Sequence, residues 1–293
     1  MKRLGNAGRA ERLCAALALI LLSIPLAHAQ RDWNTPTTPF HVIGNIHYVG
    51  TKGLGSYLIT TPEGHFLLDG ATKEAAPLIE RNIETLGFKL TDVKYLLNSH
   101  AHLDHSGGLA ELKQKSGAQL VASEGDRSAL EGGFYLGWES RHDLDVPPVK
   151  VDRIIADGGT LTLGKVTLKA NLTPGHTRGC TSWSMPVTEQ GRTLQVLVFC
   201  SSSVALNRLV NPPQYPGIVD DYEKTFAKAK TMKVDVFLAP HPEFFNMEAK
   251  RARIGQHGAN PFIDAAEFAA HVARSEADFR KQLATQQAAV KNP

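Results

Sequence analysis

Four side chains able to bind a metal ion fall within six consecutive residues of the sequence. The segment reads His100, Ala101, His102, Leu103, Asp104, His105. Imidazole nitrogens and a carboxylate suit Zn²⁺, and all four side chains can coordinate it without a redox role. Burying so many ionisable groups without a cation would be costly. The segment therefore predicts a metal centre rather than a set of structural histidines.

Two further histidines stand just beyond the expected ends of strands. His176 follows a Pro-Gly turn pair, and His241 follows an Ala-Pro pair after a short apolar strand. In an extended segment His100 and His102 would share a face, whereas the following loop lets the last two ligands of the segment turn towards a second centre. Together, His176 and His241 supply the one ligand that each of two centres still lacks.

The elements that must position these side chains alternate between short β-rich runs and helical patterns. We expect strands at 43–49, 56–60, 66–68 and 93–97, and a helix at 76–86 whose apolar residues recur at spacings of three and four. Gly87 stands where a helix ends in a left-handed residue. The strand at 93–97 ends directly before the ligand segment, which places that segment in a strand-to-helix loop.

The second half repeats this order. We expect strands within 161–172, at 194–199 and at 234–238, and a helix that Asp220 and Asp221 open and that runs through Ala229. A terminal helix begins near Glu267. The segment 123–148 is less regular and rich in aromatic residues, so it is either a loop that shapes a pocket or a helix and loop packed on the core. The alternation predicts an α/β fold.

The N-terminus has the composition of a secretory signal peptide. Four basic residues precede an apolar run at 13–22, and Ala27-His28-Ala29 has the small residues of a cleavage site. We therefore expect residues 1–29 to be removed and residues 30–293 to form one domain in the periplasm, without a stable membrane anchor. The apolar run is well short of the roughly 20 residues of a spanning helix.

Cleavage also changes the charge and the cysteine count. It would remove four basic residues and one acidic residue, which brings the net charge from +3 to zero. Nothing else forms a basic cluster, so no nucleic-acid partner is expected. Of three cysteines Cys14 would leave, and Cys180 and Cys200 are most simply joined in a disulfide. The alternative is that Cys200 binds zinc as a thiolate.

The patterns HAHLDH at 100–105, GH at 175–176 and APH at 239–241 resemble the metallo-β-lactamase superfamily over residues 42–264. The resemblance implies a four-layer αβ/βα sandwich with two zinc ions at the strand edges. It also implies that His100, His102 and His176 bind the first zinc and that Asp104, His105 and His241 bind the second. Asp69, at the end of an apolar strand, would orient a zinc histidine; its alternative role is to cap a helix.

The residues after Phe199 bear on the substrate. Superfamily hydrolases that act on thioesters, lactones or RNA usually place a bridging aspartate there, but this chain has Cys200-Ser201-Ser202-Ser203. A serine in place of a ligand cysteine resembles subclass B3 β-lactamases. Ser201 would match the ligand position of related enzymes, and Ser203 would donate a hydrogen bond to the substrate carboxylate.

The expected function is therefore a monomeric, dizinc hydrolase that opens the β-lactam ring of penicillins, cephalosporins or carbapenems and confers antibiotic resistance. Zinc lowers the pKa of bound water to about 7, which supplies a hydroxide nucleophile at neutral pH. His100, His102, His176 and Asp104 would carry the catalysis. One alternative is a lactonase or thioesterase of the same superfamily. Another is a structural zinc protein, which a set of six ligands with an open water position fits poorly, because structural sites are closed.

Overall fold

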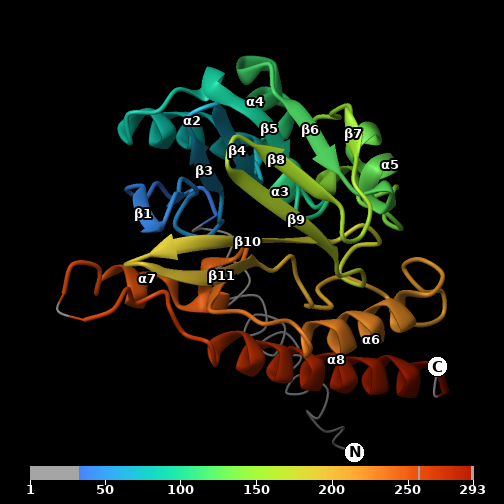
Figure 1. Ribbon diagram of the computed structural model, residues 1–293. Helices are drawn as coiled ribbons and strands as arrows, with labels where there is room; N and C mark the ends of the chain where they lie inside the picture. Colours follow the sequence, from blue (N-terminus) through green and yellow to red (C-terminus); the bar gives the residue numbers. More distant parts are fainter. Residues whose placement is uncertain (1–32, 257, 292–293) are drawn as a thin grey trace, which may run out of the picture.

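Two β-sheets pack face to face, with helices on both outer faces (Figure 1). The computed structural model describes residues 33–256 and 258–291. The first sheet has the strand order β1-β2-β3-β4-β5-β6-β7 and the second has the order β12-β11-β10-β9-β8. This arrangement confirms the predicted four-layer αβ/βα sandwich. The predicted signal peptide, residues 1–29, lies outside the described residues.

The strands of the first sheet are β1 (Phe40–Ile43), β2 (Ile46–Tyr48), β3 (Tyr57–Thr61), β4 (Gly64–Leu68), β5 (Val93–Leu97), β6 (Gln119–Ala122) and β7 (Arg153–Ile154). Those of the second are β8 (Thr160–Leu163), β9 (Val166–Leu172), β10 (Thr181–Glu189), β11 (Arg192–Val198) and β12 (Val236–Leu238). Strands β4 to β7 are parallel, and so are β11 and β12. Their carboxyl ends therefore meet at shared sheet edges, where loops can bring side chains together.

The longer helices cover the two outer faces. They are α2 (Ala76–Thr85), α4 (Leu109–Ser116) and α5 (Glu124–Gly132) on the first sheet, and α6 (Ile218–Ala229) and α8 (Glu267–Lys291) on the second (Figure 1). Shorter helices are α3 (Leu103–Ser106) and α7 (Met247–Arg251), with 3-10 turns η1 (Lys73–Ala75), η2 (Leu90–Asp92), η3 (His142–Leu144) and η4 (Pro242–Phe245). In the described part of the chain, none of these helices is both long enough and apolar enough to cross a bilayer.

Helix α2 shows how the sequence sets an element. Its buried residues include Ala76, Ile79 and Ile83, at the predicted helical spacing. Gly87 follows with a φ of 84°, and the N–H groups of Gly87 and Phe88 donate to the carbonyls of Glu84 and Ile83. This is the hydrogen-bond pattern of a Schellman cap, in which glycine tolerates the left-handed conformation.

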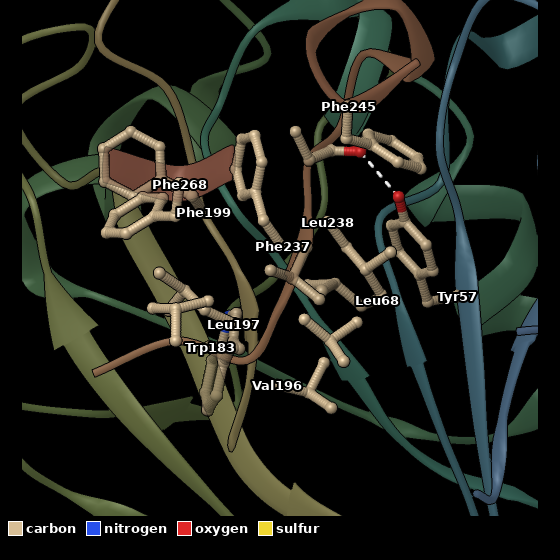
Figure 2. Close-up of a cluster of buried hydrophobic side chains, with 14 of the residues drawn as sticks. Tyr57, Leu68, Trp183, Val196, Leu197, Phe199, Phe237, Leu238, Phe245 and Phe268 are labelled. Carbon is tan, nitrogen blue, oxygen red and sulfur yellow. Dashed lines mark hydrogen bonds between the residues drawn. The ribbon is translucent and has the colours of Figure 1, made fainter. Parts of the chain in front are cut away.

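The main core lies between the two sheets. Phe66 and Leu68 of the first sheet belong to one buried cluster with Trp183 and Val196 of the second, and Figure 2 shows several of these side chains meeting. Tyr57 spans the layers as well, because its hydroxyl donates to the carbonyl of Ala239, 2.6 Å away. Apolar packing and this buried hydrogen bond fix the two sheets against each other.

The structure differs from the strand predictions at several places. The run at 43–49 is not one strand but the hairpin of β1 and β2, because Gly44 has a φ of 56° and turns the chain with Asn45. Strands β6 and β7 were not predicted, and neither was β10, although Trp183, Met185 and Val187 alternate as buried residues along it. Intervening Ser and Pro residues weaken its β-rich character. The terminal helix near Glu267 is confirmed as α8.

Candidate metal centre

His100 and His102 lie in the loop after β5, as predicted, whereas Asp104 and His105 lie within the single turn of α3 rather than in that loop. Strand β10 of the opposite sheet holds the backbone of the loop: Thr181 donates its N–H to the carbonyl of Ser99 at 2.8 Å. The indole Nε1 of Trp183 donates to the carbonyl of Asn98 at 3.2 Å. The loop that carries the histidines is thus supported by both sheets, which limits its freedom to move.

The structure brings His100, His102 and His176 together as a first group of donors. Nε2 of His176 lies 3.1 Å from Nε2 of His100 and 3.1 Å from Nδ1 of His102. All three residues are buried. They come from the loop after β5 and from the loop after β9, 74 to 76 residues apart in sequence.

Asp104, His105 and His241 form a second group beside the first. Oδ2 of Asp104 lies 3.2 Å from Nε2 of His105 and 3.2 Å from Nε2 of His241. The two imidazole nitrogens are themselves 3.2 Å apart. The rings of His100 and His105 have centroids 4.3 Å apart, so the two groups are neighbours. All six predicted metal-binding side chains therefore converge at one edge of the sandwich.

Contacts between layers place His241. The carbonyl of Ala239 accepts from Tyr57, and the carbonyl of Pro240 accepts from the N–H of Gly55 at 2.6 Å. Both donors belong to the first sheet or to the loop before β3, whereas His241 follows β12 of the second sheet. The first sheet thus holds in place a side chain that the second sheet supplies.

Burial sets the protonation of the first group. It lowers the pKa of His100 and His102 well below the usual value, and lowers that of His176 to about 4. The three rings are therefore neutral at pH 7, which is the form that binds metal ions. Charge repulsion between the neighbouring rings acts in the same direction on His100 and His102.

The second group has a different balance. Burial alone would raise the pKa of Asp104, but His105 and His241 hold it well below its usual range. Burial alone would lower the pKa of His241, but hydrogen bonding to Asp104 and its negative charge raise it. Asp104 is therefore ionised at neutral pH, and the second group carries a negative charge among imidazoles.

Both groups fit a metal ion. Three imidazole nitrogens that approach to 3.1 Å cannot all satisfy one another, because each neutral ring has one acceptor and one donor nitrogen. A cation at their shared point would satisfy all three. The ligand atoms of His100, His102 and His176 all lie within 4.8 Å of one another, and so do those of His100, Asp104 and His105, the last two of which belong to the second group. Imidazole and carboxylate donors in such sets suit Zn²⁺.

Asp69 lies behind the second group. Its Oδ1 accepts from the N–H of Ser99 at 2.7 Å, and its Oδ2 is 3.9 Å from Nδ1 of His105. Burial raises the pKa of Asp69 to about 6, against the lowering effect of His105. The residue before the first helical turn, η1, is Thr72 rather than Asp69. The carboxylate thus faces a candidate ligand and does not cap this turn.

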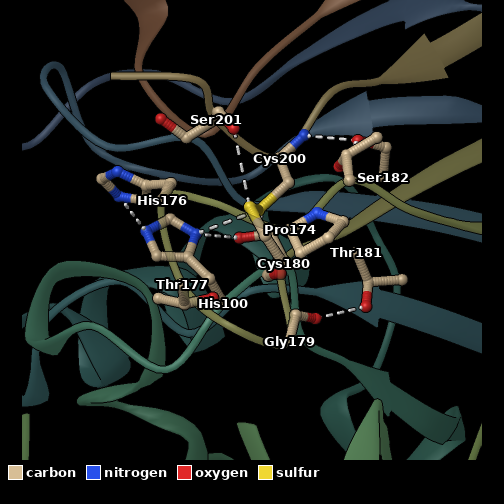
Figure 3. Close-up of a disulfide and its surroundings, with 12 residues drawn as sticks. His100, Pro174, His176, Thr177, Gly179, Cys180, Thr181, Ser182, Cys200 and Ser201 are labelled. Carbon is tan, nitrogen blue, oxygen red and sulfur yellow. Dashed lines mark hydrogen bonds between the residues drawn. A yellow bond between two sulfur atoms is a disulfide. The ribbon is translucent and has the colours of Figure 1, made fainter. Parts of the chain in front are cut away.

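The disulfide and Ser201 lie close to His100 and His176 of the first group (Figure 3). Cys180 and Cys200 form a disulfide with a Cα–Cα distance of 5.9 Å, so Cys200 offers no thiolate. Its Sγ lies 3.6 Å from Nδ1 of His100. The carbonyl of Ser203 is 2.8 Å and its hydroxyl 3.2 Å from Nδ1 of His176. The Ser201 and Ser203 hydroxyls are 3.3 Å apart.

Sequence reasoning missed two residues that contact the first group or the loops that carry it. The ring of Tyr135 stacks on His102, with centroids 4.0 Å apart and planes at 14°. The buried carboxylate of Asp126, on α5, accepts from the N–H of Ala101 between the two histidines. Both lie in the irregular segment 123–148, which contains a helix packed on the core and also a loop that reaches the site. The aromatic cluster at 134–138 was the available signal.

Comparison with solved structures gives close matches over most of the chain. The subclass B3 metallo-β-lactamase BJP-1 of Bradyrhizobium japonicum is 52% identical with a TM-score of 0.88, over 89% of this chain and 99% of that one. The metallo-β-lactamase FEZ-1 of Legionella gormanii is 35% identical with a TM-score of 0.84, over 87% and 98% of the two chains.

Curated sequences match over a shorter region. The hydroxyacylglutathione hydrolase of Bradyrhizobium sp. (strain ORS 278) is 31% identical over 41% of this chain and 39% of its own length. The N-acyl homoserine lactonase AttM of Agrobacterium fabrum is 30% identical over 42% of this chain and 56% of its own. The matches thus span about two fifths of the first of these relatives and just over half of the second.

The family model of the metallo-β-lactamase superfamily matches residues 56–189, which include the ligand segment and His176. The two solved structures extend the likeness to nearly the whole described chain, with the same sandwich of sheets and helices. The chain therefore belongs to the metallo-β-lactamase superfamily of metal-dependent hydrolases, and it resembles the enzymes of subclass B3.

Proposed function

We propose that this protein is a β-lactamase that binds two zinc ions and opens the lactam ring of penicillins, cephalosporins or carbapenems. The observation that carries the proposal is the convergence of two adjacent donor groups at one sheet edge, in a chain 52% identical to a B3 metallo-β-lactamase. His100, His102 and His176 would hold the first ion. Asp104, His105 and His241 would hold the second.

When bound, the ions would lower the pKa of water to about 7 and polarise the lactam carbonyl. The neutral rings of His100, His102 and His176 are ready ligands, because no proton has to leave them. Asp104, ionised and next to both His105 and His241, can also orient the attacking water. Asp69 would orient His105 from behind.

The loop after β11 supports a lactam over a lactone or thioester. It carries Cys200-Ser201-Ser202-Ser203, in which the cysteine is consumed by a disulfide and no carboxylate is present. Ser201 and Ser203 would donate hydrogen bonds to the substrate carboxylate. Hydrolysis of an acyl-homoserine lactone or a glutathione thioester is the second candidate, which the matches to a lactonase and to hydroxyacylglutathione hydrolases favour.

One assay separates these candidates. Purified protein is mixed in parallel with a carbapenem, an acyl-homoserine lactone and a glutathione thioester, each with and without a chelator. We expect chelator-sensitive loss of the carbapenem to dominate. Chelator-sensitive turnover of only the lactone or only the thioester would reject the assignment to β-lactams.

A zinc titration of the metal-free protein tests the number of ions. Activity and bound zinc are measured at each step, and two bound equivalents are expected. Saturation of both activity and binding at a single equivalent would contradict the dizinc proposal.

We also propose that the chain is exported to the periplasm as a monomer, with cleavage after Ala29. The charged, apolar and small-residue layout of residues 1–29 supports export. N-terminal sequencing of the periplasmic protein should begin at Gln30, and ultracentrifugation should give one chain per particle. An intact N-terminus in the membrane fraction would contradict the export proposal.

A further inference from the structure

Asp126 is a buried carboxylate for which the proposed chemistry has no use. It lies in the first turn of α5 and is 3% exposed. Its Oδ2 accepts from the N–H of Ala101 at 3.0 Å and from the hydroxyl of Thr177 at 2.8 Å. Its Oδ1 accepts from the N–H of Gly179 at 2.9 Å. In the described part of the chain, no lysine, arginine or histidine forms an ion pair with Asp126. These three hydrogen-bond donors therefore offset the cost of burying its carboxylate.

The three donors belong to the two loops that supply the first donor group. Ala101 stands between His100 and His102, and Thr177 directly follows His176. One carboxylate thus joins the loop after β5 to the loop after β9. The histidines of these loops meet with nitrogens 3.1 Å apart, so a small change in loop separation would alter the ligand geometry directly.

The backbone segments around the Asp126 carboxylate are closely packed. A Cβ on Gly179 would lie 2.3 Å from the backbone nitrogen of Asp126, and one on Gly125 would lie 2.6 Å from the carbonyl of Arg178. The hydroxyl of Ser123, just before α5, adds a bond of 2.6 Å to the carbonyl of Gly179. The start of α5 and the His176 loop therefore behave as one closely packed unit.

Burial raises the pKa of Asp126 to about 6, while the bonds from Thr177, Gly179 and Ala101 lower it. The carboxyl is therefore ionised at pH 7 and above. Hydrogen bonds from N–H and O–H groups to an ionised carboxylate are stronger and shorter than neutral ones. The charge makes this connection firmer than a neutral side chain of the same shape would.

We propose that Asp126 is a positioning residue for the first metal site, which sets the spacing between His176 and the pair His100 and His102. This inference rests on the proposed metal-binding function of those histidines. Groups that orient metal ligands typically change metal affinity by roughly 10–100-fold when they are removed. The effect should be confined to the first site, because the donors to Asp126 flank only its ligands.

The principal test is Asp126→Asn, which keeps the shape but places an amide N–H₂ against an N–H or O–H donor. Zinc dissociation constants for both sites are measured by competition with a chromophoric chelator, and the visible spectrum of the cobalt-substituted protein reports first-site geometry. We expect the first-site dissociation constant to rise about 10–100-fold and the second to change less than about threefold. The cobalt spectrum should change shape.

Asp152→Asn is the matched control. Asp152 also accepts a backbone N–H, that of Leu120 at 2.8 Å, but it pairs with Lys113 and its donor flanks no ligand. Its substitution should leave both zinc constants unchanged even where it lowers the melting temperature. If Asp126→Asn lowers only the melting temperature of the metal-free protein, or weakens both sites equally, the positioning role is wrong.

Thr177→Val keeps the test decisive if Asp126→Asn does not fold. It removes one of the three donors at similar volume, and we expect the first-site constant to rise by about threefold to tenfold, below the range for loss of a whole orienting group. An unchanged first-site constant in this variant would overturn the proposal. Because zinc binding is measured without any β-lactam, a wild-type protein that binds two zinc ions but opens only lactones would refute the proposed substrate and leave this inference standing.

Discussion

The two donor groups differ in how their imidazoles are supported. In the first, Nδ1 of His100 lies 2.9 Å from the hydroxyl of Ser99, and Nδ1 of His176 lies 2.8 Å from the carbonyl of Ser203. In the second, Nδ1 of His105 lies 3.9 Å from Oδ2 of Asp69, beyond hydrogen-bond distance, and among the described residues neither it nor the buried Nδ1 of His241 has a hydrogen-bond partner. Partners of this kind fix the orientation of metal ligands. The histidine rings of the first group are therefore held in a fixed orientation before metal binds, whereas those of the second group are less constrained.

The solvent exposure of the ligand side chains also indicates that the second group is less constrained than the first. The side chain of His241 is 19% exposed, and its nearest second carboxylate, that of Glu243, is 3.6 Å away and 63% exposed. The ring of His102 is instead covered by Tyr135. We expect the first site to bind zinc more tightly than the second, by about tenfold or more.

Removing one ligand from each group should have the largest effects. His176→Ala should release the first ion and lower kcat/KM by more than about 10³-fold, because the remaining ligands cannot hold the polarising charge in place. His241→Ala should lose the second ion while keeping the first. Metal analysis after dialysis, together with β-lactam kinetics, checks both. Equal loss of zinc from both sites in His241→Ala would contradict the division into two groups.

The disulfide supports the first group from behind. Replacing both Cys180 and Cys200 by Ser should lower the free energy of unfolding by about 3 kcal/mol, since the bond closes a loop of 20 residues. Because Cys200 lies against His100, the first-site zinc affinity should fall more than the second. Denaturant titration and chelator competition measure the two effects. A stability loss with unchanged zinc affinity would limit the disulfide to a structural role.

Tyr135 offers a smaller and cleaner comparison. Tyr135→Leu removes the ring stacked on His102 and should weaken first-site zinc binding by about tenfold, as for other groups that orient a ligand. Tyr135→Phe keeps the ring and removes a buried hydroxyl that has no hydrogen-bond partner among residues 33–256 and 258–291, so it should leave zinc affinity unchanged and stability equal or higher. The same loss of affinity in both variants would mean that the hydroxyl, not the ring, supports His102.

The smallest effect is expected at Glu243. Its carboxylate is largely exposed and is beyond hydrogen-bond distance of His241, so Glu243→Gln should change the second-site zinc constant by less than about threefold. Chelator competition at low and high salt is the measurement. A tenfold weakening of second-site zinc binding would show that Glu243 does support His241. The two groups would then differ less in how their histidines are supported.

Local patterns in the sequence predicted an α/β fold and a cluster of metal ligands, and the resemblance to the superfamily implied the sandwich and the full set of six ligands. Four ligands are adjacent in the chain, and the other two follow strands that end at the same edge. The aromatic residues of 123–148 indicated a possible pocket loop, but the individual contacts of Asp126 and Tyr135 were not predicted, because they are made with loops far away in sequence. The hairpin at Gly44 was missed for a different reason: an apolar run continues through a turn that backbone geometry alone defines.

The disulfide between Cys180 and Cys200 affects which side chains near His100 can bind a metal ion. His100, Cys180 and Cys200 lie close enough together that a chain with both sulfurs reduced would present two thiols and an imidazole as a rival, softer ligand set. Once the two sulfurs are joined in the disulfide, they are no longer thiolate ligands, and His100 is left to bind a metal together with the neighbouring histidines. We therefore expect the disulfide to keep these two sulfurs from binding a metal ion in the mature protein.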